Sequence, residues 1–236
     1  MNWRFIDSGF CTAQFNMRFD ESLAREMQGG TTTPTLRVYG WRPPAISIGR
    51  NQDIADFDHR KLREEGIDIV RRPTGGRAIL HSQELTYSVV MPALTIGPRE
   101  IYRTVSGALV RGLLLLGIEA ELTGNDDLPR KPANDAASVP CFSSSAKYEL
   151  QYHGKKLVGS AQRRFGNVVL QHGSVLLGKD HLRILDFMKA RGVGLGEYLF
   201  SRTIDVGTIL GRCVSFEEAA EAFKKGFQEA LSITFV

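Results

Sequence analysis

Hydrophobic residues recur with helical spacing in three segments of the chain. The three stripes are Phe15, Phe19, Leu23 and Met27; Ile101, Val105, Leu109 and Gly112; and Phe216, Ala220, Phe223, Phe227 and Leu231. Residues three or four positions apart lie on one face of a helix, so each stripe predicts an amphipathic helix. Pro98 suits the start of the second helix and Gly117 its C-terminal cap. Ser215 followed by Glu218 is a capping-box pattern for the third helix.

Short runs of strand-forming residues fill much of the remaining chain. They lie at residues 3–7, 36–39, 45–48, 67–70, 78–80, 85–91, 148–152, 156–163 and 168–176. A polar, helix-prone segment at residues 56–65 interrupts the early strands, which we expect to form a meander. The turns His153-Gly154 and Gly166-Asn167 predict two consecutive hairpins over the last three strands.

The composition is that of a folded protein with both helices and strands. The chain has 236 residues, of which 42% are hydrophobic and 24% charged, and these values are near the globular average. At this length one large α/β domain over residues 1–236 is favoured over two small domains.

Charge and cysteine content exclude some classes of partner and indicate the cellular compartment. The net charge is +4, and basic residues are scattered apart from the pairs Arg71-Arg72 and Arg163-Arg164, so we expect no nucleic-acid binding. The first residues lack an apolar signal core, and the longest aliphatic run is residues 113–116. We therefore expect no export and no membrane partner. Three cysteines without a disulfide-type pattern suit free thiols in the cytoplasm.

The first candidate for chemistry is the turn Arg71-Arg72-Pro73-Thr74-Gly75-Gly76-Arg77, between two predicted strands. Paired glycines let a backbone approach a ligand closely, and the flanking arginines attract an anion or a polar carbonyl. An ordinary β-turn with surface arginines explains the residues equally well, because the Lys-Ser/Thr of a P-loop is missing.

The second candidate is residues 156–162, where Gly159, Ser160 and Ala161 follow one another in a predicted strand. Three small residues leave one strand face almost bare, which suits a linear ligand lying against the backbone. Lys156 at the edge of such a groove can carry a tuned charge. The alternatives are a strand packed beneath a helix and an ordinary solvated lysine.

The third candidate is Cys141, in a long loop at residues 123–145. A thiolate is a strong nucleophile, and a nearby cation raises the thiolate fraction at neutral pH. An inert buried thiol is the alternative, and it is our expectation for Cys11 and Cys213.

Two histidines follow the strands that lead from the first two motifs. His81 and His172 can therefore line a shared groove, although a core histidine explains each of them as well. No two histidines have metal-ligand spacing and no C-x-x-C motif occurs, so we expect no metal site.

Several segments, taken in order, resemble the superfamily of lipoate and biotin protein ligases and octanoyltransferases. They are RRPTGGRAILHSQELTYSV from Arg71, CFSSSAKYEL from Cys141, GKKLVGSAQRR from Gly154 and LQHGSVLL from Leu170. The resemblance runs from Asn16-Met17 to the final helix. It implies the catalytic-domain fold of these ligases, a single α/β (α+β) domain with a mixed, largely antiparallel sheet flanked by helices. It also implies an acyl tunnel between the first two candidate motifs.

Within the superfamily the chain is most similar to the cysteine-dependent octanoyltransferase (LipM-like) branch. Lipoate ligases typically have a third glycine where this chain has Arg77. The branch places a cysteine ahead of a Tyr-Glu-Leu strand and fifteen residues before a lysine, and Cys141 and Lys156 have this spacing. Ser82 departs from the aspartate often found at its position, so we assign it no role.

The resemblance implies that a monomeric enzyme moves an octanoyl group from octanoyl acyl carrier protein to a lysine of a lipoyl-acceptor domain. Glycine cleavage H protein and the 2-oxoacid dehydrogenase E2 subunit are such acceptors. Cys141 would form the acyl thioester, and Lys156 would stabilise the thiolate and the oxyanion. The implied substrate-binding residues are Arg72, Thr74, Gly75, Gly76, Arg77, His81, Gly159, Ser160, Ala161, Gln162, His172 and Gly173.

Two alternatives to this activity stay open. Because the donor thioester is already activated, the transferase needs no cofactor, whereas an ATP-dependent lipoate or octanoate ligase would need ATP and Mg. A non-catalytic acyl-binding relative is the other alternative, and the presence of both Cys141 and Lys156 argues against it.

Overall fold

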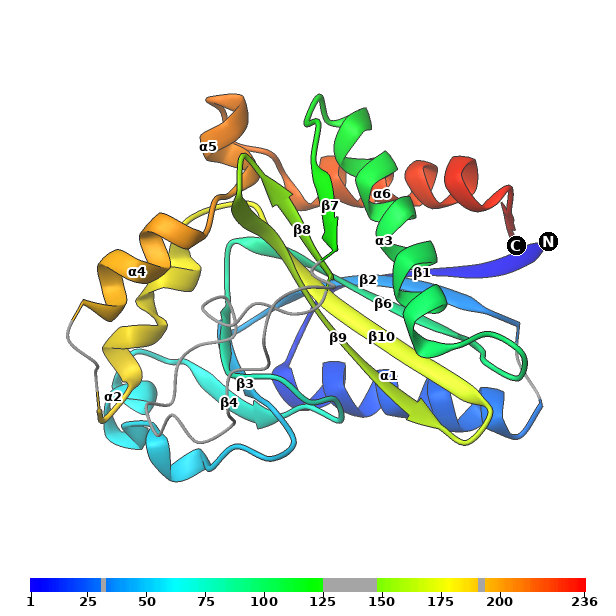
Figure 1. Cartoon of the computed structure of the whole chain (residues 1–236). Coiled ribbons are helices and arrows are strands. Elements are labelled where there is room, and N and C mark those ends of the chain that lie inside the picture. Colours follow the sequence, from blue (N-terminus) through cyan, green and yellow to red (C-terminus); the bar gives the residue numbers. More distant parts are fainter. Residues whose placement is uncertain (31–32, 125–147, 191–193) are drawn as a thin grey trace.

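Eight strands form one mixed sheet in the computed structural model, which describes residues 1–30, 33–124, 148–190 and 194–236 (Figure 1). The strands are β1 (Asn2–Cys11), β2 (Thr35–Trp41), β6 (Glu84–Pro92), β7 (Glu121–Gly124), β8 (Tyr148–Tyr152), β9 (Lys155–Phe165), β10 (Val168–Leu176) and β11 (Thr234–Phe235). Their order is β11-β1-β2-β6-β10-β9-β8-β7. All pairs are antiparallel except those of β1 with β2 and β11. The mixed, largely antiparallel sheet confirms the predicted fold class.

Three long helices cover the two faces of this sheet (Figure 1). α1 (Ala13–Gln28) lies on one face, and α3 (Pro98–Leu115) and α6 (Phe216–Leu231) lie on the other. The largest hydrophobic cluster fills the space between α3, α6 and the sheet. All three predicted helices are confirmed. Within the described residues, no helix has both the length and the apolar character needed to cross a membrane.

α1 buries polar as well as apolar side chains. Its buried residues are Ala13, Asn16, Met17, Asp20, Leu23, Ala24 and Met27. Phe15 belongs to the predicted stripe but is 47% exposed, because steps of four residues drift by about 40° each around a helix with 3.6 residues per turn. The buried face is centred on Met17 and Asp20, so it brings a carboxylate against the sheet.

A second sheet of three strands lies beside α1 (Figure 1). Its order is β4 (Asp68–Arg71), β3 (Ala45–Ile48) and β5 (Ile79–His81). Around it lie α2 (His59–Glu64), α4 (Leu195–Arg202) and the 3-10 segments Ile54–Asp56 and Asp180–Phe187; α5 (Val206–Leu210) precedes α6. The expected meander is wrong, because β3 and β4 are parallel and do not join β2. Parallel strands need a crossover, and α2 lies within it.

A bulge in β9 decides the direction of the Lys156 side chain. β9 pairs with β8 at Leu150–Val158 and next at Gln151–Lys156, so Leu157 is an extra residue on the β9 side. Leu157 and Val158 both pack into the large hydrophobic cluster on the α3 side. The bulge thereby turns Lys156 to the opposite face, which α1 covers.

Candidate active site

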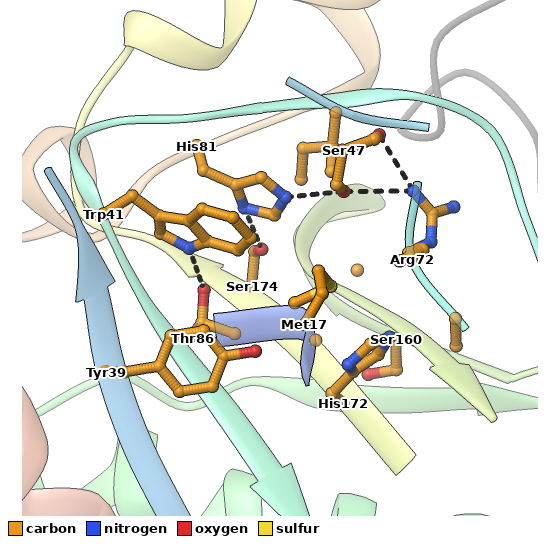
Figure 2. Close-up of a pocket in the computed structure, with 14 residues that line it drawn as sticks. Met17, Tyr39, Trp41, Ser47, Arg72, His81, Thr86, Ser160, His172 and Ser174 are labelled. Carbon is orange, nitrogen blue, oxygen red and sulfur yellow. Dashed lines mark hydrogen bonds between the residues drawn. The ribbon is translucent and has the colours of Figure 1, made fainter. Parts of the chain in front are cut away.

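A narrow slot lies between the two sheets and α1 (Figure 2). Its lining residues are Met17, Tyr39, Trp41, Ser47, Arg72, Ile79, His81, Thr86, Gly159, Ser160, Ala161, His172, Gly173 and Ser174. The cavity volume is about 30 Å³, which is room for one or two water molecules. A longer guest must therefore part the walls of the slot.

Backbone and small residues form the wall of the slot on β9 and β10. Gly173 has no room for a side chain, because a Cβ there would stand 2.3 Å from the carbonyl oxygen of Gly159. The Ser160 hydroxyl lies 2.7 Å from the Tyr87 hydroxyl, which belongs to the cluster on the other face of the sheet. Ala161 completes the wall. This flat surface is what the run of small residues predicts.

Arg72 closes the turn that follows β4. Its guanidinium donates to the carbonyl oxygens of Gly75 at 2.8 and 3.0 Å, of Arg77 at 2.6 Å and of Ser47 at 3.0 Å. These donors therefore bind the protein's own carbonyl groups, and Arg72 fixes the shape of the turn.

The predicted substrate-binding residues divide into two groups. Arg72, His81, Gly159, Ser160, Ala161, His172 and Gly173 line the slot, whereas Thr74, Gly75, Gly76, Arg77 and Gln162 are not among its lining residues. Gly76 packs against Gly49, where an added Cβ would stand 1.9 Å from the Gly76 carbonyl oxygen. The Gln162 amide donates to Gln171 at 3.2 Å. The close contact between Gly49 and Gly76 requires a glycine at residue 49, and Gly76 itself has a positive φ of 90°.

On one side of the slot, a histidine links a hydroxyl to a carboxylate. His172 Nε2 lies 2.7 Å from Thr74 Oγ1, and its Nδ1 lies 3.0 Å from Asp20 Oδ2. We call Thr74, His172 and Asp20 the Asp20 triad. Arg37 and the Tyr39 hydroxyl also donate to the Asp20 carboxylate, each at 2.8 Å. All five side chains are buried, and they hold α1, β2, β10 and the turn together.

The surroundings of Asp20 favour its charged form. Burial alone raises the pKa of Asp20, but the hydrogen bond with His172 and the charge of Arg37 outweigh burial and lower the pKa below its ordinary value. Burial and the nearby Asp20 charge raise the pKa of Tyr39 well above its ordinary value. Asp20 is therefore an anion that Arg37 neutralises and to which a neutral Tyr39 donates.

On the other side of the slot, a second histidine makes the same kind of link. His81 Nε2 lies 2.7 Å from Ser47 Oγ, and its Nδ1 lies 2.8 Å from Glu84 Oε1. We call Ser47, His81 and Glu84 the Glu84 triad. Figure 2 shows the His81 ring stacked on Trp41, with centroids 4.0 Å apart and planes 12° apart. Figure 2 also shows Ser47 between His81 and Arg72.

The Glu84 carboxylate is buried with an uneven set of partners. Its Oε1 accepts from Ser174 at 2.9 Å and from Thr86, besides its contact with His81. Its Oε2 has no hydrogen-bond partner among the described residues. Among the described residues, Glu84 forms an ion-pair contact only with His81. Unlike Asp20, Glu84 has no ion pair with an arginine of the described residues.

Lys156 is a buried ammonium group. Its Nζ lies 2.9 Å from Glu149 Oε1, and the two side chains are 6% and 8% exposed, so the solvated lysine of the alternative interpretation is excluded. Lys156 precedes Gly159 and Ala161 on the same face of β9. At about 3.3 Å per residue these two lie roughly 10 and 16 Å along the strand from Lys156.

The two triads lie at different distances from Lys156. Ser174, which is bonded to the Glu84 triad, pairs with Gly159. His172 pairs with Ala161, two residues further from Lys156. The Glu84 triad is therefore at the Lys156 end of the slot, and the Asp20 triad is at the far end.

The predicted nucleophile, Cys141, lies outside the described residues, so its position stays a prediction. Cys11 is half-buried and Cys213 is exposed, so the expectation that both are buried is wrong. Cys213 lies between α5 and α6. Within the described ranges, no group of three or more His, Cys, Asp or Glu side chains could hold a metal ion.

Several site residues were not among the predicted ones: Asp20, Tyr39, Trp41, Ser47, Glu84 and Glu149. Asp20 has a signal in the sequence, since a polar residue three positions after Met17 falls on the buried face of α1. Glu84 is close to His81 in the sequence, but it begins the next strand, so no periodicity marks it. Ser47 and Glu149 have no signal, because their roles depend on how distant segments pair.

Comparisons with known proteins identify the family to which the chain is similar. Residues 12–228 match the family model of the lipoyl protein ligase A/B catalytic domain. An octanoyltransferase LipM of Symbiobacterium thermophilum is 42% identical, with 99% of this chain and 88% of that protein covered. An octanoyltransferase LipM of Bacillus subtilis is 34% identical, with 98% and 87% covered.

Solved structures show the same fold. A lipoate-protein ligase A bound with ATP is similar with a TM-score of 0.80 and 27% identity, over 100% of this chain and 88% of the other. Ta0514 of Thermoplasma acidophilum, described as a putative lipoate protein ligase with bound lipoic acid, gives a TM-score of 0.75 and 25% identity over the same shares.

Proposed function

The chain belongs to the lipoyl protein ligase A/B catalytic domain family, and we propose that within this family it is an octanoyltransferase of protein lipoylation. The enzyme takes an octanoyl group from octanoyl acyl carrier protein and delivers it to a lysine of a lipoyl-acceptor domain, such as that of glycine cleavage H protein or an E2 subunit. The relatives named octanoyltransferase LipM support this activity, because they match nearly the whole chain.

The observation that carries the proposal is the position of Lys156. Its ammonium group is buried beyond one end of the slot, and the β9–β10 wall of this slot is flat. A linear acyl chain can lie along the small residues that begin at Gly159, with its carbonyl toward Lys156. A cation in this place stabilises a thiolate and a developing oxyanion. Glu149, at 2.9 Å, fixes the position of the ammonium group.

The reaction has two acyl-transfer steps. The Cys141 thiolate attacks the donor thioester, the donor sulfur leaves as its thiolate, and an octanoyl thioester forms on Cys141. The acceptor amine then attacks this thioester to form an amide and to release the enzyme thiol. Exchange of thioesters is nearly isoenergetic and amide formation is downhill, so no ATP is needed. A free catalytic thiol suits a reducing compartment, and we place the reaction in the cytoplasm.

An ATP-dependent lipoate or octanoate ligase is the second candidate. The fold similarity to a lipoate-protein ligase A bound with ATP favours it. Arg77, which replaces the third glycine of the typical ligase motif, favours the transferase.

Intact-mass measurement with octanoyl acyl carrier protein, with and without ATP, tests both candidates. We expect one octanoyl adduct on Cys141 that hydroxylamine removes and that moves to an acceptor domain without nucleotide. Cys141→Ala should form no adduct and should lose transfer, whereas Cys11→Ser and Cys213→Ser should retain both. A strict requirement for ATP and a free fatty acid would assign the chain to the ligases.

A further inference from the structure

The Glu84 triad has the geometry of a proton relay, and neither acyl-transfer step described above uses it. We propose that Ser47, His81 and Glu84 take up the proton that the acceptor lysine loses when its amine attacks the acyl thioester. This inference rests on the proposed function and assigns further residues to its second step.

Hydrogen bonding gives the relay one direction. Arg72 donates to Ser47 Oγ at 3.2 Å and cannot accept, because a guanidinium has only donors. The Ser47 hydroxyl proton can therefore point to His81 Nε2, 2.7 Å away. Glu84 holds the Nδ1 side of the ring at 2.8 Å and leaves Nε2 as the acceptor. In this arrangement an imidazole draws a proton from a hydroxyl group.

The Glu84 carboxylate lies against Nδ1 of His81, the ring nitrogen that does not contact Ser47. Among the described residues, Glu84 has His81 as its ion-pair contact, and its Oε2 has no hydrogen-bond partner. Asp20, behind His172, already lies 2.8 Å from Arg37. An imidazolium formed at His81 during the transfer therefore lies beside a carboxylate that has no ion pair with an arginine of the described residues.

The relay opens onto the Lys156 end of the slot. Ser47 and His81 line the slot, whereas Thr74 of the other triad is not among the lining residues. Glu84 pairs with Leu176 of β10, and the neighbouring residue of β10 pairs with Val158 of β9. Two strand spacings of about 4.8 Å place the Glu84 backbone roughly 10 Å from this end of β9.

The proposed step balances in atoms and electrons. A C–N bond forms between the lysine amine and the octanoyl carbon as the C–S bond to Cys141 breaks, and the sulfur keeps the bonding electron pair. One amine proton passes to Ser47 Oγ while the Ser47 proton passes to His81 Nε2. The imidazolium then gives this proton to the Cys141 thiolate, so the products are an amide and the free thiol.

A comparison of two acyl acceptors tests the relay. Preformed octanoyl-enzyme is mixed with an acceptor domain, whose amine must lose a proton, or with dithiothreitol at a pH where its thiolate is present, which has no proton to lose. Ser47→Ala and His81→Gln should slow transfer to the lysine by about 10²–10⁴-fold. Transfer from the same variants to the thiolate should remain close to the wild-type rate. Glu84→Gln, which keeps the side-chain shape, should show the same selective loss.

The Asp20 triad supplies matched controls. Thr74→Ala and His172→Gln should slow both acceptors alike, because they alter the shape of the slot and not the relay. Equal loss with both acceptors in Ser47→Ala would overturn the relay. An octanoyl ester on Ser47 in the Cys141→Ala variant would also overturn it, since Ser47 would then be a nucleophile. Failure of the wild-type protein to form any acyl-enzyme would instead overturn the proposed function.

Discussion

The two ends of the slot are built from the same three kinds of group but differ in charge. At the far end, Asp20 accepts from Arg37 and Tyr39, contacts His172, and has no oxygen without a partner. At the Lys156 end, Glu84 contacts His81, and its second oxygen has no hydrogen-bond partner among the described residues. A hydroxyl, an imidazole and a carboxylate in a row therefore do not by themselves identify a reacting group.

Because of this difference in charge balance, we assign different roles to the two ends of the slot. A satisfied, charge-balanced network in a low-dielectric interior stabilises one arrangement of the elements that it joins. The Asp20 triad does this for α1, β10 and the turn after β4. The Glu84 triad lies nearer to Lys156 and exposes Ser47 and His81 to the slot, so it is placed to act on a bound group.

The largest expected effect is at the Lys156 end. Lys156→Ala should slow acylation of Cys141 by about 10²–10⁴-fold, because it removes the cation that, in the proposed mechanism, stabilises the thiolate and the oxyanion. Lys155→Ala should change the rate little, since neighbouring strand residues point to opposite faces. Time courses of intact mass measure the rates, and alkylation of Cys141 across pH provides a second readout. Identical alkylation profiles in the two variants would remove the role given to Lys156.

The next effect concerns stability at the far end. Asp20→Ala should lower the free energy of unfolding by about 3–5 kcal/mol, because it leaves Arg37 buried and unpaired. Glu84→Ala should cost less, about 1–3 kcal/mol, because it leaves no buried arginine behind. Urea unfolding measures both changes, and adding Arg37→Met to Asp20→Ala should recover part of the loss. A larger loss for Glu84→Ala would reverse the comparison.

A smaller change in the free energy of unfolding is expected at the β9–β10 wall, which runs between the two ends of the slot. Gly173→Ala should lower the free energy of unfolding by about 1–3 kcal/mol, because its Cβ collides with the β9 backbone. Gly107→Ala is a suitable control, since nothing lies within 4 Å of a Cβ at that exposed helical position. The control should stabilise the protein by about 0.5–1 kcal/mol. Equal melting temperatures for the two variants would contradict the close approach of β9 and β10.

The smallest expected effect is a pH dependence of the stability that Asp20 contributes at the far end of the slot. The pKa of Asp20 is lowered in the folded protein, so its contribution to stability is present above the unfolded-state pKa and is lost as the pH falls through the folded-state pKa. The difference in unfolding free energy between wild type and Asp20→Asn should therefore shrink as the pH is lowered from about 5 toward 3. A difference that grows on acidification would show that Asp20 is not the stabilised anion described here.

Local features of the fold follow from the sequence. The cap of α6 has the predicted contact, since the Ser215 side chain accepts from the Glu218 amide at 3.1 Å, and the two hairpins over β8–β10 form at their predicted turns. The pairing of β3 with β4 and the bulge that turns Lys156 were not predictable in this way. Both depend on which strands meet, and strict alternation along β9 would have placed Lys156 on the wrong face.

For the candidate site too, residues in local motifs were predictable and their distant partners were not. His81, His172 and the small-residue strand were predicted because each lies in a short, recognisable motif. Their partners come from distant parts of the chain: Ser47 is 34 residues from His81, and Asp20 is 152 residues from His172. Hydrogen-bond networks of this kind are fixed by tertiary packing, so single-sequence patterns do not reveal them.

The decisive experiment determines which end of the slot receives the carbonyl of the acyl group. A thioester of an octanoyl analogue with a diazirine on its terminal carbon is bound, irradiated, and its cross-links are located by peptide mass spectrometry. We expect labelling at the far end, at Met17, Tyr39 or Ala161, because the proposed mechanism places the carbonyl toward Lys156. Labelling of Ser47 or His81 in their place would reverse the orientation of the chain and contradict the assignment of a reacting end and a holding end.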